Sequence, residues 1–248
     1  MKKLLTAILA LILMFSVIPG GNIEAASSIN KQAGKVYADI LERYIEVYKA
    51  KQNNYEYYSI SKSSDDDLAV GYASEIGDFN IVSEFMMEAQ TGGLIYRIMD
   101  WNKDGTPELF IANPKGKIYA AFTYNQGNAV YLMSSFQTTN CVLCKDGIIG
   151  RWVEGGAGGN VWIDKISKNK LKHVVELGSY YEGKMFYTQT KNGKTTNISE
   201  TKYTKLSKKY CKPLKVKFYK ADNKAVKNIR NGKFAYSNQK SWKIKGTV

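Results

Sequence analysis

Histidine, cysteine and long apolar runs are scarce in this chain, and each scarcity argues against a class of protein. The 248 residues include one histidine, His173, and three cysteines. A single histidine in a strand-like context, without a Gly-x-Ser-x-Gly motif, argues against the common nucleophilic hydrolase arrangements. No internal repeat of fixed period is present, which argues against a propeller or a solenoid. These absences favour a protein that is not an enzyme.

The cysteines are too few and too irregularly spaced for a strong metal or redox prediction. Cys141 and Cys144 form a CxxC pair, but the stretch NCVLCKDG is typical of a strand that runs into a turn. A redox thiol is usually stabilised by a helix N-terminus, which this stretch lacks. A zinc set of His173 with the three cysteines is a weak hypothesis because of the spacing. With Cys211, the odd count leaves two alternatives open: buried free thiols, or one disulfide.

One apolar run is present, and it lies near the N-terminus. The chain begins MKK, continues with LLTAILALILMFSVI, and then reaches small residues around Ala25 and Ala26. This pattern predicts a signal peptide over residues 1–26. A retained membrane anchor is the alternative, but the run of roughly 15 residues is shorter than a bilayer requires. No later segment is apolar enough to span, and no lipid-anchor cysteine or sorting motif is evident. We expect a secreted, extracellular protein without a transmembrane segment in the mature chain.

Acidic residues are scarce in the C-terminal part. Residues 160–248 contain 22 Lys and Arg against 5 Asp and Glu, a net charge of +17, whereas residues 27–159 carry a net charge of −4. Such a surface either keeps the protein soluble or adheres to an anionic polymer. For an exported protein, the polymer would be cell-wall phosphate or anionic lipid, with no specific nucleic acid. We expect two regions, 27–159 and 160–248, that belong to one continuous domain.

The periodicity of the chain changes after Gly93. Residues 33–51 place apolar side chains at three- and four-residue spacings, which predicts an amphipathic helix, and residues 79–90 predict a shorter one. Short runs rich in β-branched and aromatic residues then alternate with turn clusters, which predicts an antiparallel meander. The GGAGG run at 155–159 precedes a strand-like segment, so we expect a hairpin and not a phosphate loop.

The C-terminal part predicts one helix and further strands. Ser199 can cap a helix that Pro213 ends, with Glu200 in its first turn. The remaining tail alternates Lys with apolar residues, which predicts a pair of strands. The fold class is therefore α+β: an N-terminal helix packed on an antiparallel meander, followed by a basic, strand-rich C-terminal part.

The run DWNKDGTPE, at residues 100–108, carries the clearest chemical signal. Calcium prefers six to eight hard oxygen ligands, which a short loop supplies by placing oxygen-bearing residues at alternate positions. Gly105 permits the sharp bend of such a loop, but the twelfth position is Ile111 where an EF-hand has a bidentate Glu. A plain turn would need fewer oxygen-bearing residues than this run has. The predicted calcium ligands are Asp100, Asn102, Asp104, Thr106 and Glu108.

The pattern D-x-N-x-D-G-x-x-E-L between strands resembles the calcium loops of FG-GAP repeats. More closely, YRIMDWNKDGTPELFI resembles a motif in uncharacterised exported proteins of Gram-positive bacteria, where it follows an N-terminal amphipathic helix. The resemblance implies calcium binding and no particular activity.

We therefore expect an exported calcium-binding protein of the binding or surface-associated type. The alternative is a secreted hydrolase of cell-wall polymers that uses two carboxylates, such as Glu154, Asp164 or Glu176.

Overall fold

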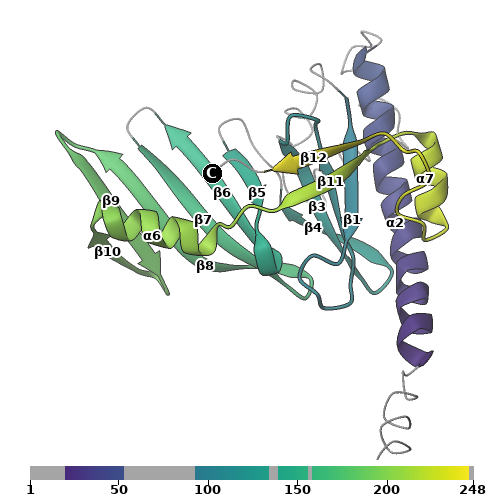
Figure 1. Cartoon of the computed structure of the whole chain (residues 1–248), viewed down its shortest axis with the longest axis horizontal. Coiled ribbons are helices and arrows are strands. Elements are labelled where there is room, and N and C mark those ends of the chain that lie inside the picture. Colours follow the sequence, from purple (N-terminus) through teal and green to yellow (C-terminus); the bar gives the residue numbers. More distant parts are fainter. Residues whose placement is uncertain (1–19, 53–92, 134–138, 156–157, 246–248) are drawn as a thin grey trace, which may run out of the picture.

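Two six-stranded antiparallel sheets with helices on their outer faces make up the described part of the protein (Figure 1). The computed structural model describes residues 20–52, 93–133, 139–155 and 158–245. The α+β class with antiparallel strands is confirmed, although the strands form two sheets where one meander was predicted. The elements are α2 (Gly20–Gln52), β1 (Ile95–Met99), β2 (Glu108–Ala112), β3 (Ile118–Asn125), β4 (Asn128–Met133), β5 (Thr139–Leu143), η2 (Lys145–Gly147), β6 (Ile148–Gly155), β7 (Gly158–Ser167), β8 (Lys170–Tyr181), β9 (Met185–Lys191), β10 (Lys194–Ile198), α6 (Glu200–Tyr210), β11 (Lys215–Lys220), α7 (Asn223–Arg230) and β12 (Ser241–Lys245).

The first sheet joins segments from the two ends of the described chain. Its strand order is β12-β11-β1-β2-β3-β4, so that the C-terminal strands lie beside β1. Tyr96 of β1 faces Tyr219 of β11 in the antiparallel register. The basic C-terminal part therefore completes the sheet that carries the predicted calcium loop.

The second sheet is a meander in chain order, from β5 at one edge to β10 at the other. The glycine-rich run lies at its β6–β7 hairpin, where Gly155 pairs with Gly158 and a strand follows. This arrangement is the predicted hairpin. The charge boundary at residue 159 lies inside β7, and it does not coincide with a break between sheets.

Alternation along β2 shows how the first sheet is buried on both faces. Leu109 and Ile111 belong to a core that includes buried residues of α2 and α7. Phe110 and Ala112 belong to a second core, together with Leu143 and other residues of the opposite sheet. Side chains alternate between faces along a strand, so one short strand contributes to both cores. The third core lies between the second sheet and α6.

Helix α7 corrects the prediction for the C-terminal tail. The alternation of Lys with apolar residues predicted two strands, but residues 223–230 form a helix between β11 and β12. Asp222 caps it by accepting a hydrogen bond from the Ala225 N–H at 2.9 Å, and Val226 and Ile229 are buried with Ala225 on its inner face. The apolar residues therefore follow helical spacing, which the Lys residues between them obscured.

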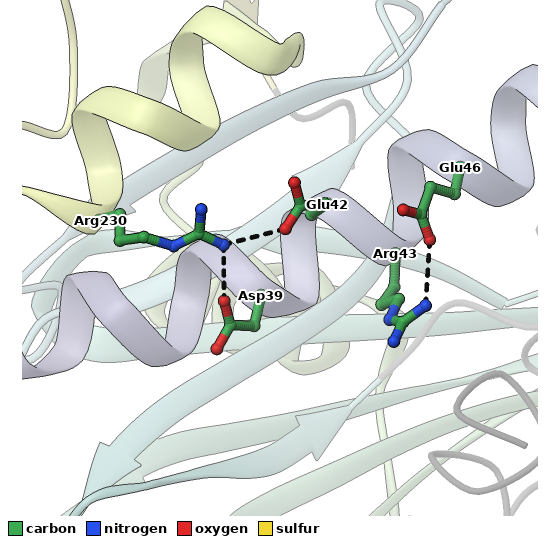
Figure 2. A network of polar contacts seen from close by, with 5 residues as sticks. All are labelled: Asp39, Glu42, Arg43, Glu46 and Arg230. Carbon is green, nitrogen blue, oxygen red and sulfur yellow. Dashed lines mark hydrogen bonds and ion pairs between the residues drawn. The ribbon is translucent and has the colours of Figure 1, made fainter. Parts of the chain in front are cut away.

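Helix α2 begins at Gly20, earlier than the predicted start at residue 33, and α7 lies close to it (Figure 1). Arg230 at the end of α7 contacts Asp39 Oδ1 at 2.7 Å and Glu42 Oε2 at 2.9 Å on α2 (Figure 2). All three side chains are exposed, so that each ion pair contributes roughly 0 to 1 kcal/mol. The apolar residues beneath them supply most of the stabilisation.

Helix α6 agrees with its prediction at the N-terminus. Ser199 accepts a hydrogen bond from the Lys202 N–H at 3.2 Å, and Glu200 lies in the first turn. The helix packs on the second sheet through half-buried Tyr203, Leu206 and Tyr210.

Two predicted features lie outside the described residues: the helix at 79–90, and residues 1–19 of the predicted signal peptide. Within the described residues, no helix combines the length and apolar character needed to cross a membrane.

Candidate calcium site

The predicted calcium loop connects β1 to β2 at one end of the first sheet. Residues 100–107 lie between these antiparallel strands, which pair from Met99 and Glu108 onward. Ile111, at the position where an EF-hand has its bidentate Glu, is fully buried in the core beneath α2. The loop is therefore of the strand-loop-strand type, without the second helix of an EF-hand.

Side-chain oxygens inside the loop hold the backbone in its turn. The Asp100 carboxylate accepts hydrogen bonds from the N–H groups of Asp104 at 3.1 Å and Gly105 at 3.0 Å. Asn102 Oδ1 accepts from the same Asp104 N–H at 3.0 Å, and Asp104 Oδ1 accepts from the Thr106 N–H at 2.9 Å. These bonds join the three acidic and amide side chains to the backbone of a single turn.

Backbone conformation explains the glycine in the motif. Gly105 has a φ of 89°, in the region that residues with a side chain rarely adopt. A Cβ at this position would meet no other atom within 4 Å. Glycine is therefore required at position 105 by the backbone conformation, and not by a lack of space for a side chain.

The loop is anchored to both sheets through its first residues. Trp101 is buried in the core between the sheets and places its ring edge-on to Phe110, with centroids 5.8 Å apart. Asn102 lies so close to Gly147 of η2 that a Cβ there would be 2.8 Å from the Asn102 Cβ. The loop is therefore held by packing as well as by its own hydrogen bonds.

Glu108 is the buried member of the predicted ligand set. Its Oε2 accepts a hydrogen bond from the Trp101 N–H at 2.7 Å. Within the described residues, its Oε1 has no hydrogen-bond partner, and neither has Oγ1 of Thr123, which is its cross-strand neighbour on β3. Burial, together with the nearby charges of Asp104 and Asp100, raises the pKa of Glu108 from 4.5 to about 8. An unpartnered, fully buried carboxylate oxygen is costly, and a cation at this point would remove that cost.

Helix α2 reaches the end of the same loop. The Tyr37 hydroxyl donates a hydrogen bond to the Pro107 carbonyl at 2.5 Å. Burial, and secondarily the Glu108 charge, raises the pKa of Tyr37 far above its usual range. No sequence pattern indicated this contact or the position of Thr123, since Tyr37 and Thr123 are both distant from the loop along the chain.

The structure thus places Asp100, Asn102 and Asp104 within one turn. Glu108 lies at the start of β2, and Thr106 lies at the end of the turn. No three His, Cys, Asp or Glu side chains of the described chain already converge as a complete metal site. The donor set of carboxylate and amide oxygens is nevertheless the type that calcium prefers. The buried Glu108 Oε1, which has no hydrogen-bond partner among the described residues, is an oxygen that a bound cation would satisfy.

The carboxylates of the hydrolase alternative lie in or at the end of strands of the second sheet. Asp164 is buried, and its Oδ2 accepts from Arg151 at 2.7 Å while its Oδ1 contacts His173 Nδ1 at 3.1 Å. Both oxygens of this buried carboxylate therefore take part in contacts within the second sheet. Glu176 is half-buried, and the side chain of Glu154 lies outside the described residues.

The three cysteines and His173 do not gather around one point. Cys141 belongs to the core between the sheets, whereas Cys144 and Cys211 belong to the core beneath α6. His173 contacts Asp164 and not sulfur. A hydrogen bond from the Cys211 thiol lowers the pKa of Cys144, which is a stabilising partner that the sequence did not indicate.

Comparison with known proteins adds little to this description. No family model matches the chain, and no curated protein matches it. One solved structure, described as "Structure of a Xanthomonas Type IV Secretion System related protein", is similar with a TM-score of 0.30 and 13% sequence identity. The similarity covers 42% of this chain and 58% of that chain.

Proposed function

We propose that this protein is an exported calcium-stabilised binding protein that associates with the cell surface. The observation that carries the calcium proposal is the buried, unpartnered oxygen of Glu108 beside the Asp100 and Asp104 carboxylates. The oxygen donors of Asn102 and Thr106 would complete the set. Because position 12 is Ile111, affinity should be that of extracellular modules, with a dissociation constant on the order of 0.1 to 1 mM.

Calcium should raise the stability of the folded protein by mass action. At about 2 mM calcium, the expected gain in the free energy of unfolding is roughly 0.6 to 1.8 kcal/mol, or about 1 to 7 °C in melting temperature for a chain of this size. Asp100→Ala and Asp104→Ala should each abolish the difference between calcium and chelator. The measurement is thermal unfolding of each variant in both buffers.

Glu182→Ala is the matched control, because it removes an exposed carboxylate in the β8–β9 turn, distant from the loop in sequence. It should keep the full calcium response. Identical melting of the wild-type protein in calcium and in chelator would show that the loop is a turn and not a calcium site.

We further propose that anionic cell-wall polymer is the partner, held by lysines of β11 and β12. The antiparallel register places Lys215 opposite Lys245, and Lys217 opposite Lys243. The side chains of Lys215, Lys217 and Lys243 are exposed, while Val216 and Phe218 between them are buried. Like charges directly opposite each other in a sheet are unfavourable, and an anionic polymer would offset that repulsion.

Charge reversal tests this surface. Changing Lys215, Lys217, Lys243 and Lys245 to Glu alters the net charge by −8 and leaves the residues 160–248 at +9. The pairs across the strands remain like-charged, so that the folded state is affected little. We expect release of the variant from wall preparations at low salt, and release of the wild-type protein as salt rises and screening shortens to about 8 Å.

Helix α6 supplies a control of equal charge. Lys202, Lys205, Lys208 and Lys209 are exposed on α6, over the outer face of the second sheet. Their reversal to Glu changes the net charge by the same amount. Equal losses from the two variants would show that diffuse charge holds the polymer, and binding that survives high salt and both reversals would contradict an electrostatic partner altogether.

A further inference from the structure

Two cysteines that are far apart in the sequence meet beneath α6. Cys144 follows β5, and Cys211 caps the C-terminus of α6, with its N–H bonded to the Ser207 carbonyl. Both side chains are buried in the same core, where the interaction with Cys211 lowers the pKa of Cys144. The Cys144 thiol in turn lies 3.6 Å from the Val142 carbonyl.

The backbone around the two thiols is fixed by pairing between the segments that carry them. Cys144 forms an antiparallel bridge with Pro213. On either side of it, the Lys145 N–H donates to the Lys212 carbonyl at 3.2 Å, and the Leu214 N–H donates to the Leu143 carbonyl at 3.0 Å. The fold therefore holds the segments that carry the two cysteines side by side.

Gly150 on β6 makes room for this contact. A Cβ at Gly150 would lie 2.8 Å from Cys211 Sγ and 2.5 Å from the Trp152 ring. The Gly150 backbone also hydrogen-bonds to Cys144. A side chain here would clash with Cys211 Sγ, so glycine leaves the room that this sulfur needs in the core.

Cys141 is excluded from this pair by the sheet. It lies three residues before Cys144, but it belongs to the core on the opposite face, between the two sheets. The CxxC spacing therefore does not identify the partner of Cys144, because Cys141 and Cys144 belong to cores on opposite faces of the second sheet.

We propose that Cys144 and Cys211 form a disulfide bond that ties the C-terminus of α6 to β5. In the structure both thiols are reduced, and export to an oxidising environment would supply the conditions for closure. The formation of this disulfide in the cell thus rests on the proposed export, whereas the choice of Cys144 and Cys211 as partners does not. The bond would close a loop of more than 60 residues and restrict the unfolded chain accordingly.

The chemistry is thiol–disulfide exchange with a small-molecule or protein disulfide as oxidant. The Cys144 thiolate attacks one sulfur of the oxidant, which forms a mixed disulfide and releases one thiolate. The Cys211 thiolate then attacks Cys144 Sγ, which forms the intramolecular bond and releases the second thiolate. Two electrons and two protons pass from the pair to the oxidant, which leaves as two thiols.

The test is oxidative refolding of the purified full chain in oxidised and reduced glutathione, independent of export. We expect a mass lower by two hydrogen atoms, one alkylatable thiol where the reduced protein has three, and a single cross-linked peptide that contains Cys144 and Cys211. The melting temperature should rise by about 5 to 15 °C relative to the reduced protein.

Serine variants identify the partners. Cys141→Ser should retain the cross-link and lose the remaining thiol, whereas Cys144→Ser and Cys211→Ser should each prevent the cross-link. Three reactive thiols in correctly refolded wild-type protein, or a cross-link that includes Cys141, would overturn the pairing. Pairing in glutathione, together with reduced protein from culture or no secretion at all, would contradict the proposed export and leave the pairing intact.

Discussion

In calcium-free buffer, the wild-type protein should lose stability on the order of 3 to 5 kcal/mol as the pH rises from about 5 to about 8. The reason is that Glu108 has a pKa of about 8 in the folded protein and 4.5 as an ordinary carboxyl. Between these values the folded state holds a proton that the unfolded state releases, so that the free energy of unfolding falls with rising pH. The contribution is complete below pH 4.5 and lost as the pH passes through about 8.

Glu108→Gln should remove this dependence. The Gln side-chain oxygen can still accept the Trp101 N–H, and Gln carries no charge. At about pH 8 in chelator, we expect the variant to be more stable than the wild-type protein, because no charge is buried. Urea unfolding at several pH values in chelator measures both effects.

Calcium should reverse the pH response. Cation binding favours the ionised carboxylate, so that the calcium-dependent gain in stability should grow from about pH 5 to about pH 8. Glu108→Gln should show a weaker calcium response at every pH. A wild-type protein with flat stability over this range in chelator, or a Gln variant with the same slope, would show that Glu108 is not the group that titrates.

Local signals in the sequence predicted the elements better than they predicted their partners. The cap at Ser199 and the turn at Gly105 depend on neighbouring residues, and the structure places both as expected. The pairing of β11 with β1, in contrast, joins residues more than 100 positions apart. The alternation of apolar and polar residues indicates that a strand has two faces, but it does not identify the neighbouring strand in the sheet.

The candidate calcium site shows the same limit. The spacing of Asp100, Asn102 and Asp104 indicated a cation loop because the ligands are adjacent in sequence. The burial of Glu108 depends on Thr123 on the neighbouring strand and on α2, and no local sequence pattern indicates these contacts. The feature that makes the site testable, a raised carboxyl pKa, therefore became visible only in the fold.

The largest structural effect should come from the contact between α2 and α7. A Cβ at Gly34 would lie 2.2 Å from the Ile229 carbonyl oxygen, which is backbone and does not rotate away. Gly34→Val should therefore push α7 from α2 and expose part of the core formed by Ala225, Val226 and Ile229. Overpacking against backbone predicts a cost of about 3 kcal/mol or more, or a fall of roughly 6 to 12 °C in melting temperature.

Lys35→Val is the matched control, because Lys35 is exposed on the same helix. It should cost only the difference in helix propensity, about 0.5 kcal/mol. A loss at Gly34→Val no larger than the loss at Lys35→Val would show that the contact with α7 tolerates a side chain at Gly34.

Gly34→Val should also weaken the calcium response, although Gly34 is not a predicted ligand. Tyr37 lies one turn further along α2, and its hydroxyl donates a hydrogen bond to the carbonyl of Pro107, the residue before Glu108. A displaced α2 would lengthen that bond and admit water to the buried carboxyl, which would lower its pKa toward the ordinary value. The pH dependence in chelator should therefore flatten together with the calcium shift. Full retention of both in a destabilised Gly34→Val protein would show that α2 supports the fold without holding the loop.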